Sequence, residues 1–332
     1  MRRHLLLMAT ATTAAVVSLA GCGSAGSSGT AAPPSSAAGA GCAPVAGGSL
    51  VVLTDDKHLQ NTDNVVPAIN KKASSPQLTA ALDKVSAALD TTKLVALNKA
   101  VDVDRKSSKA AAQDFVTANN ITAGLAKGPG GKITVGAANF SENATLGEIY
   151  GLALTAAGYQ VKVQQIGNRE LYEPALEKGD VDVVPEYAAT LATFLAGKVN
   201  GKNGKDPSSP DLSETMTNLK ALGDNVGLVF GTPSQAQDQN AFATTTAFAD
   251  KYGVKTLSDL AAKCSGAATV LGGPPECPQR PKCQAGLVSV YNFQAGKFNS
   301  LDSAGPLTKS ALKQGTISAG LVLSSDGALA AG

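Results

Sequence analysis

Residues 132–195 decide the fold, and they read KITVGAANFSENATLGEIYGLALTAAGYQVKVQQIGNRELYEPALEKGDVDVVPEYAATLATFL. A short β-prone run, 133–135, precedes a segment whose apolar residues recur at the i, i+3, i+4, i+7 spacing of one buried helix face. Gly158 ends that helix, as glycine often does. A strand (159–163), a second helix reaching Gly179 and a third strand (181–184) follow. This β-α-β-α-β order is typical of a parallel α/β sheet.

Two loops at the carboxyl ends of these predicted strands are the first candidates for a binding site. Ligands of open α/β sheets bind outside the carboxyl ends of the strands. One loop is 137–143 and includes Asn139, and the other is 186–190 and includes Tyr187 and Thr190.

The same device of helix, glycine and strand occurs in each half of the chain. Residues 175–179 read ALEKG before a β-prone run, and residues 311–315 read ALKQG before another. The repetition predicts two α/β lobes instead of one long sheet. We expect a helix to begin at Pro76, further helices to be capped by Thr91 or Thr92 and by Ser107 or Ser108, and Thr256 with Asp259 to form a capping box. Pro174 requires its helix to begin late or to kink.

The N-terminus predicts an exported lipoprotein. Residues 1–21 have two arginines, an apolar run too short to span a membrane, and the sequence Leu19-Ala20-Gly21 before Cys22. LAGC resembles the bacterial lipobox, which implies cleavage before Cys22 and a lipid on its sulfur; the alternative is an ordinary secretory signal. Residues 22–48 are Gly, Ser, Ala and Pro with almost no charge, so we expect a flexible tether there.

Charge and motifs exclude several classes of function. The formal net charge is +2, and it becomes zero once Arg2 and Arg3 are removed, so nothing favours nucleic acid as a partner. The chain contains no Gly-x-Ser-x-Gly, HExxH, P-loop or Rossmann fingerprint. We therefore predict a protein that is not an enzyme, with no cofactor and no metal site.

Several motifs in order resemble the osmoprotectant-binding proteins, the glycine betaine/choline (OpuAC/ProX-type) substrate-binding components of ABC importers. They are GAANFSENATLGEIY (136–150), GNRELYEPALEKGDVD (167–182), PEY (185–187), QAQDQNAF (235–242), GGPPECPQRP (272–281) and residues 321–327. The resemblance implies a type II periplasmic-binding-protein-like fold with two lobes and a ligand cleft between them. It also implies a permease and an ATPase subunit as partners.

The segments that resemble this family do not stand in the family's order. LVVLTDDKHLQNTDNVVPAI (50–69) and LVALNKAVDVD (94–104) resemble its C-terminal part, yet they precede the rest here. We interpret this as a circular permutation, with residues 121–131 joining the old termini; the alternative is a separate helical domain. The substrate-binding domain is then 49–332, with lobe 1 at about 62–235 and lobe 2 at about 236–332 plus 49–58.

Five cysteines divide into one lipidation site and two pairs. Cys277 and Cys283 lie six residues apart in a proline-rich loop of an exported protein, which predicts a local disulfide. Cys42 and Cys264 remain, and we expect a second bridge between them. A zinc site is the alternative for these four cysteines, and the lack of a nearby histidine disfavours it.

The resemblance also implies a set of ligand-binding residues. Arg280 falls at the position of the family's carboxylate-binding arginine, Thr190 at a further carboxylate contact and Tyr187 at one wall of its aromatic cage. The other cage positions read Asn240, Leu323 and Asp63 where aromatic residues are expected. The complete predicted set also contains Asn139, Asp238, Gln239 and Ser324.

This set is more polar than a betaine cage, and it shapes the functional prediction. We expect a lipid-anchored, extracytoplasmic, monomeric binding protein of an ABC importer that captures a small polar solute of the osmoprotectant type. The alternatives are a solute-sensing or envelope-interaction lipoprotein on the same fold, or an importer component whose ligand is not a betaine.

Overall fold

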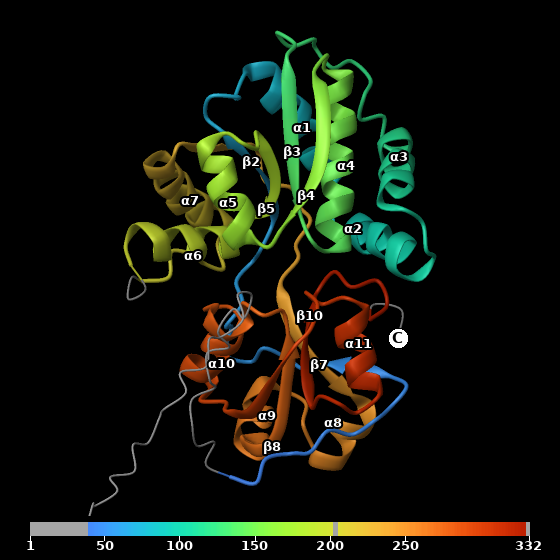
Figure 1. The fold of residues 1–332 in the computed structure, drawn as a ribbon, viewed down its shortest axis with the longest axis vertical. Coiled ribbons are helices and arrows are strands. Elements are labelled where there is room, and N and C mark those ends of the chain that lie inside the picture. The colour runs from blue at the N-terminus through green and yellow to red at the C-terminus, as the bar shows by residue number, and fades with distance from the viewer. Residues whose placement is uncertain (1–38, 202–204, 330–332) are drawn as a thin grey trace, which may run out of the picture. The chain divides into compact units, whose positions relative to one another are not determined.

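The computed structural model describes residues 39–201 and 205–329. The signal sequence, Cys22 and most of the predicted tether therefore lie outside the described residues. The described chain forms two five-stranded sheets, each covered by helices on both faces (Figure 1).

The first lobe is built on the sheet with strand order β4-β3-β5-β2-β6. Strand β3 is parallel to β4 and to the central strand β5, and β2 is antiparallel to both of its neighbours. The strands are β2 (Val65–Asn70), β3 (Lys132–Ala138), β4 (Gln160–Gly167), β5 (Val183–Tyr187) and β6 (Leu228–Phe230).

Alternating side chains of these strands pack into two cores, one on each face. Val65 and Ile69 face one core while Val66 and Ala68 face the other, as the period of two in a strand requires. The first face is covered by α1 (Pro76–Ala88), α2 (Thr91–Asn98), α3 (Ser108–Ala118) and α4 (Ser141–Ala156), with the π-helical turn η1 (Lys99–Val103) after α2. The second is covered by α5 (Arg169–Lys178), α6 (Ala188–Val199) and α7 (Leu212–Val226).

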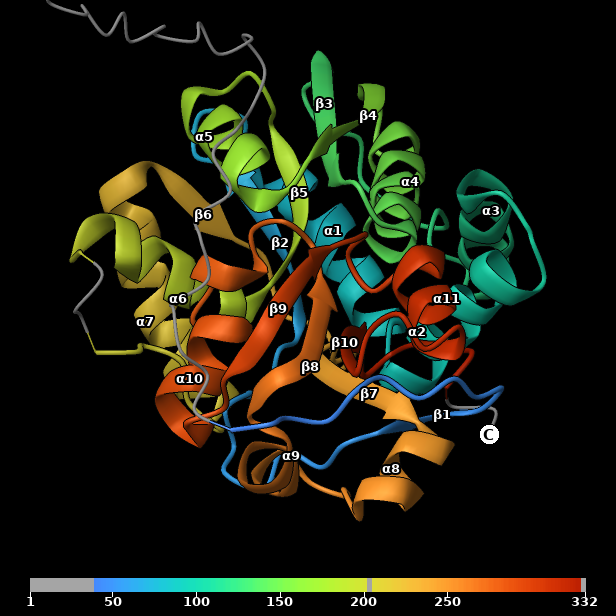
Figure 2. The ribbon, with the colours of Figure 1, turned by 60° about the horizontal axis from the view of Figure 1, so that its bottom comes forward.

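The second lobe is built on the sheet with strand order β1-β7-β10-β8-β9. Strands β8, β9 and β10 form its parallel part, and β7 is antiparallel to β1 and to β10. The elements are β1 (Leu50–Val52), β7 (Asn240–Thr245), α8 (Thr246–Tyr252), α9 (Leu257–Cys264), β8 (Gly266–Gly273), η2 (Cys277–Gln279), α10 (Gln284–Tyr291), β9 (Ala295–Ser300), α11 (Pro306–Lys313) and β10 (Ala319–Leu323). Figure 2 shows β1 beside β7 at the edge of this sheet.

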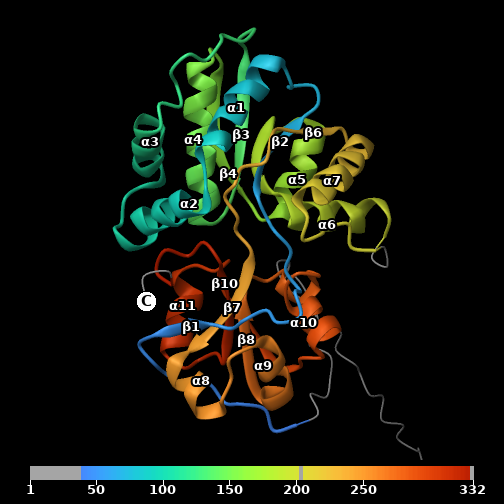
Figure 3. The ribbon, with the colours of Figure 1, turned by 180° about the vertical axis from the view of Figure 1, so that it is seen from behind.

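Two neighbouring segments connect the lobes, one on each side of the first lobe in sequence. Residues 53–64 lead from β1 to β2, and residues 231–239 lead from β6 to β7 (Figure 3). They run antiparallel: the amide of Val65 donates to the carbonyl of Ala236 at 3.0 Å, and the amide of Asp238 donates to the carbonyl of Asp63 at 3.0 Å. Both connections therefore cross at one place, directly beside the cavity described below.

Several predicted caps are present, and one is corrected. Ser75 caps α1 with Pro76 at its first position, Ser107 caps α3, and Thr256 and Asp259 form a capping box on α9. The cap of α2 is Asp90, whose carboxylate accepts from the amide of Lys93 at 2.9 Å, instead of either predicted threonine. Helix α5 runs from Arg169 through Pro174, so it does not begin late.

The predicted flexible tether is wrong over its last ten residues, 39–48, because they pack on the second lobe. Ala40 forms a bridge with Gly266, and Cys42 is buried and forms a disulfide with Cys264. A side chain at Gly266 would lie only 2.2 Å from the amide nitrogen of Gly41, so glycine permits this close approach. The composition of this segment did not predict its packing, because the segment has little apolar surface. Backbone pairing and one disulfide hold it on the second lobe instead.

Candidate functional site

A cavity of about 100 Å³ lies between the two lobes, beside the crossing segments. This is several times the roughly 10–15 Å³ that one water molecule needs, so the cavity suits a small solute. Its wall is lined by Asp63, Ala138, Asn139, Phe140, Arg169, Tyr172, Tyr187, Thr190, Thr193, Phe194, Asp238, Asn240, Arg280, Pro281, Lys282, Ser303 and Leu323.

A buried ion pair forms one wall in the first lobe. Nε and Nη2 of Arg169 donate to the two carboxylate oxygens of Glu186 at 2.9 and 2.6 Å, and Nη2 also donates to the hydroxyl of Thr190 at 2.9 Å. The hydroxyl of Tyr172 donates to Glu186 at 2.9 Å. Burial alone would lower the pKa of Arg169, but the charge of Glu186 raises it. The guanidinium therefore stays charged, and its hydrogen bond holds the hydroxyl of Thr190 in position.

Asp63, in the connection before β2, is 2% exposed and places its carboxylate at the start of α6. Its Oδ1 accepts from the amides of Ala189 at 2.7 Å and Thr190 at 3.2 Å. Burial raises the pKa of Asp63 to about 6, although the charge of Arg169 and these hydrogen bonds act in the opposite direction. Asp63 thus brings a carboxylate into the cavity at a helix N-terminus, which favours the charged form.

Tyr187 and Glu142 belong to a buried polar cluster that joins the lobes. Glu142, on α4 of the first lobe, accepts from the hydroxyl of Tyr187 at 2.6 Å, from Nδ2 of Asn98 at 2.5 Å and from the hydroxyl of Ser325 in the second lobe at 2.5 Å. The nearby carboxyl of Asp238 accepts from the amide of Ser325 at 3.1 Å. Burial raises the pKa of Glu142 and of Asp238, and the charge of Glu142 raises that of Asp238 further.

Arg280 reaches across the cleft. Its Nε and Nη2 donate to the carboxylate oxygens of Glu170 on α5 at 3.1 and 2.8 Å, and Nη2 lies 3.4 Å from Glu276 in its own lobe. Arg280 follows η2 in a loop closed by the Cys277–Cys283 disulfide. Burial would raise the pKa of Glu170, but the hydrogen bonds and charge of Arg280 lower it. An ion pair thus joins the two lobes across the cleft.

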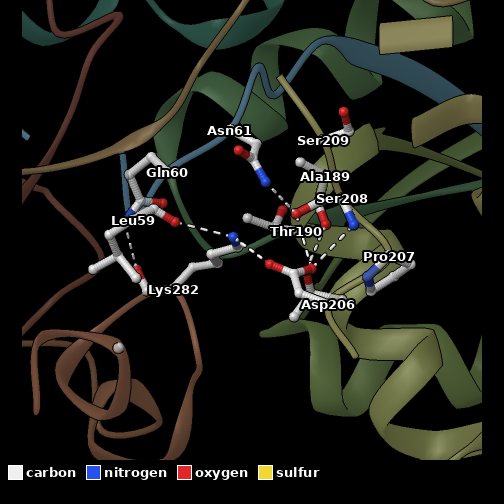
Figure 4. Close-up of polar contacts among 12 residues, drawn as sticks. Leu59, Gln60, Asn61, Ala189, Thr190, Asp206, Pro207, Ser208, Ser209 and Lys282 are labelled. Carbon is white, nitrogen blue, oxygen red and sulfur yellow. Dashed lines mark hydrogen bonds and ion pairs between the residues drawn. The ribbon is translucent and has the colours of Figure 1, made fainter. Parts of the chain in front are cut away.

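A second ion pair closes another side of the cavity. Nζ of Lys282 lies 2.6 Å from Oδ2 of Asp206 and donates to the carbonyl of Leu59 at 3.0 Å (Figure 4). Asp206 also accepts from the amide and hydroxyl of Ser208 and from the hydroxyl of Thr193. The 206–208 loop of the first lobe is therefore held against the second.

A model of the protein family described as the substrate binding domain of ABC-type glycine betaine transport systems (OpuAC) matches residues 45–118 and 131–331. The chain belongs to this family. Among curated proteins it is similar to the glycine betaine-binding protein YehZ of Escherichia coli strain K12, with 26% identity over 207 residues. That match covers 60% of this chain and 66% of YehZ.

Solved structures similar to this OpuAC-type chain are periplasmic binding proteins. AgaA of A. tumefaciens R10 in complex with agropinic acid is 14% identical, with a TM-score of 0.28 over 55% of this chain and 45% of that one. OppA of Haemophilus influenzae in complex with a peptide is 11% identical, with a TM-score of 0.28 over 56% and 45%. The family match and the two sheets confirm the predicted two-lobed α/β fold class.

Most of the predicted ligand-binding residues of this OpuAC-type chain lie on the cavity wall. They are Asp63, Asn139, Tyr187, Thr190, Asp238, Asn240, Arg280 and Leu323. Gln239 and Ser324 do not line it and instead bond each other: the amide of Gln239 donates to the hydroxyl of Ser324 at 2.8 Å, and the amide of Ser324 donates to the carbonyl of Gln239 at 2.9 Å.

Several residues that line the cavity were not predicted from the sequence. The cavity is more aromatic than predicted, because its wall also includes Phe140, Tyr172 and Phe194. The ring centroid of Phe140 lies 6.2 Å from that of Tyr187. Residues three and four positions apart lie on the same face of a helix. Once Thr190 was predicted to line the site, Thr193 and Phe194 on the same helix could have been predicted to line it too. Arg169 follows β4 at the same edge as the two loops we selected, and Lys282 carried no signal beyond its closeness to Arg280.

Both predicted disulfides are present, Cys42–Cys264 and Cys277–Cys283. Their four sulfurs are thus unavailable as thiolate ligands for a metal. Residues 39–201 and 205–329 contain no group of three or more His, Cys, Asp or Glu side chains that could bind a metal ion. The same ranges contain no helix long and apolar enough to span a membrane.

Proposed function

We propose that this protein is the substrate-binding lipoprotein of an ABC importer and that it captures a small polar zwitterion between its lobes. The observation that carries this proposal is the cavity itself. It combines a guanidinium from the second lobe, Arg280, with aromatic and carboxylate groups of the first lobe, such as Tyr187 and Asp63. A zwitterion presents the complementary pair of charges in one small molecule.

Lobe closure couples capture to delivery. A ligand that touches both lobes stabilises the closed form by its higher affinity for that form. Its carboxylate replaces Glu170 as the partner of Arg280, while its cation lies against the first lobe. The closed form then docks on a permease driven by an ATPase subunit, which are the partners that this function requires.

The proposed location is the outer face of the cytoplasmic membrane. The LAGC sequence at 19–22 supplies the lipid-anchored cysteine, and the uncharged segment that follows supplies the tether. Residues 39–48 then attach that tether to the second lobe. The proposed protein works as a monomer, since one chain supplies both walls of the cavity.

The order of segments is proposed to be a circular permutation of the family order. The family match falls into two blocks, 45–118 and 131–331, and the break between them contains the glycine-rich residues 128–131. A rearranged chain in which residues 45–118 follow residue 331 should fold and bind the same ligand. Failure of this rearranged chain to fold, while the natural chain folds, would contradict the permutation.

A thermal-shift screen of the purified protein against betaines, choline, carnitine, amino acids and polyols tests the function, followed by calorimetry. The variants Arg280→Ala and Tyr187→Ala should each weaken binding at least tenfold. The ligand should be recovered chemically unchanged, as capture requires. Binding that neither substitution affects would place the ligand elsewhere and overturn the proposal.

A further inference from the structure

The charged groups of the cavity are unevenly paired. Each cation on its wall has a carboxylate partner: Arg169 pairs with Glu186, Arg280 with Glu170 and Glu276, and Lys282 with Asp206. Asp63 has no ion-pair partner within the described parts of the chain, although it lines the same cavity and is almost completely buried. Asp238, also on the wall, likewise lacks a cationic partner there. The cavity therefore contains buried negative charge that a bound cation would balance.

The two oxygens of Asp63 have different roles. Oδ1 accepts both backbone amides at the start of α6, from Ala189 and Thr190. Neither of these two hydrogen bonds reaches Oδ2, and the nearby hydroxyl of Thr190, which accepts from Arg169, also lowers the pKa of Asp63. The charged groups that face Asp63 are Arg169 on α5, which is occupied by Glu186, and Asp238 in the crossing segment. Oδ1 thus holds the Asp63 side chain in position, and Oδ2 can accept a hydrogen bond from a ligand.

We infer that Asp63 selects ligands whose cationic group carries at least one N–H, namely ammonium or guanidinium zwitterions, over fully methylated quaternary ammonium compounds. This inference rests on the proposed function and specifies its ligand class. An N–H donor would form a charge-assisted hydrogen bond with Oδ2. A quaternary ammonium has no N–H, so it would bury this oxygen without a partner, and a buried unpaired acceptor is unfavourable. The aromatic side chains Tyr187 and Phe194 still accommodate the methyl or methylene groups of such a ligand.

Pairs of ligands that differ by one methylation step test this inference. The probes are dimethylglycine against glycine betaine and N-methylproline against proline betaine, with guanidinoacetate as a guanidinium compound, each measured by calorimetry. We expect the N–H member of each pair to bind at least tenfold more tightly. In Asp63→Asn, whose amide oxygen can still accept the two backbone amides, we expect this preference to fall to within about threefold.

Asp211→Asn is the matched control. Asp211 also caps a helix, accepting from the amide of Ser213 at 2.8 Å, but it does not line the cavity. This variant should keep the wild-type preference. If Asp63→Asn fails to fold, the preference of the wild-type protein decides the question without it.

The outcomes separate this inference from the proposed function. Tighter binding of the betaines, or a preference that Asp63→Asn leaves unchanged, would overturn the role of Asp63. The importer function would stand in that case, provided that Arg280→Ala still weakens binding at least tenfold. If none of these zwitterions binds, both the inference and the proposed ligand class fail.

Discussion

The ion pair of Arg169 and Glu186 shows how individual side chains support the cavity. Both side chains are buried, at 8% and 1% exposure, and three further hydrogen bonds involve them. Such a pair contributes little net stability compared with apolar packing, but removing one member leaves the other charge buried. Its role is to hold Thr190 and the start of α6 in position.

We expect Arg169→Met to lower the free energy of unfolding by about 3–5 kcal/mol, because Glu186 would remain buried and unpaired. Denaturant titration measures this loss. Lys99→Met is the control: it breaks a half-exposed pair with Asp104, and we expect a loss below about 1 kcal/mol. Equal losses in the two variants would contradict the assigned importance of the buried pair.

The raised pKa of Asp63 predicts a pH dependence of stability. Its pKa is about 6 in the folded protein against 3.8 as the ordinary value. Between these values the folded state holds a proton that the unfolded state has lost, so stability falls as the pH rises through this window. Glu142 and Asp238 act in the same direction.

The contribution of Asp63 to this pH dependence of stability can be isolated by substitution. The stability of wild type relative to Asp63→Asn should fall by about 2 kcal/mol between pH 4 and pH 7, because the amide does not titrate. Denaturant titrations of both proteins at several pH values measure the difference. Parallel stability curves would show that Asp63 does not titrate in this range.

At the scale of elements, the two disulfides have different roles. Cys42–Cys264 closes a long loop, with a sequence separation of 222, whereas Cys277–Cys283 closes a loop of separation 6 that carries Arg280. A longer loop means a larger gain from restricting the unfolded chain. The first bridge therefore serves stability, and the second serves the position of Arg280.

Replacing each pair of cysteines by alanine tests this division. We expect Cys42→Ala with Cys264→Ala to cost about 3–5 kcal/mol of unfolding free energy and to leave ligand affinity within about twofold. Cys277→Ala with Cys283→Ala should cost less, about 2 kcal/mol, but weaken binding severalfold. The reverse pattern would contradict the assignment.

Elements with strong local signals could be predicted from the sequence, and those that depend on distant partners could not. The β-α-β-α-β run from β3 to β5 and the caps Ser75, Ser107 and Thr256 have local causes. The packing of residues 39–48 depends on Gly266 and Cys264, more than 200 positions away in the sequence. Tyr187 and Thr190 were found through a motif, whereas Tyr172 and Phe194 reach the cavity only through the packing of α5 and α6.

For the whole molecule, the ion pair between Arg280 and Glu170 is one of several links that favour the closed over the open arrangement of the lobes. It joins the lobes, and it occupies the guanidinium that we propose for the ligand carboxylate. Both side chains are partly exposed, at 26% and 39%, so the pair contributes at most about 1 kcal/mol. The ligand carboxylate must therefore compete with Glu170 for the guanidinium of Arg280.

Glu170→Gln should therefore tighten ligand binding by up to about fivefold, the equivalent of about 1 kcal/mol. It should also expand the ligand-free protein in small-angle scattering, because one link between the lobes is lost. Glu276→Gln is the matched control, since Glu276 pairs with Arg280 inside the second lobe and should not change compactness. Weaker binding in Glu170→Gln would mean that Glu170 assists the ligand.

The two adjacent connections between the lobes have a consequence for how the protein is made. The first lobe comes from one uninterrupted stretch, so all of its strands, β2 to β6, exist once residue 230 has been synthesised. The second lobe is split: β1 has no partner until β7 is made almost 200 residues later, and β8 and β10 follow still later. Synthesis therefore completes the first lobe while the start of the second remains an unpaired strand, and Cys42 cannot be oxidised with Cys264 until long after the first lobe has been made.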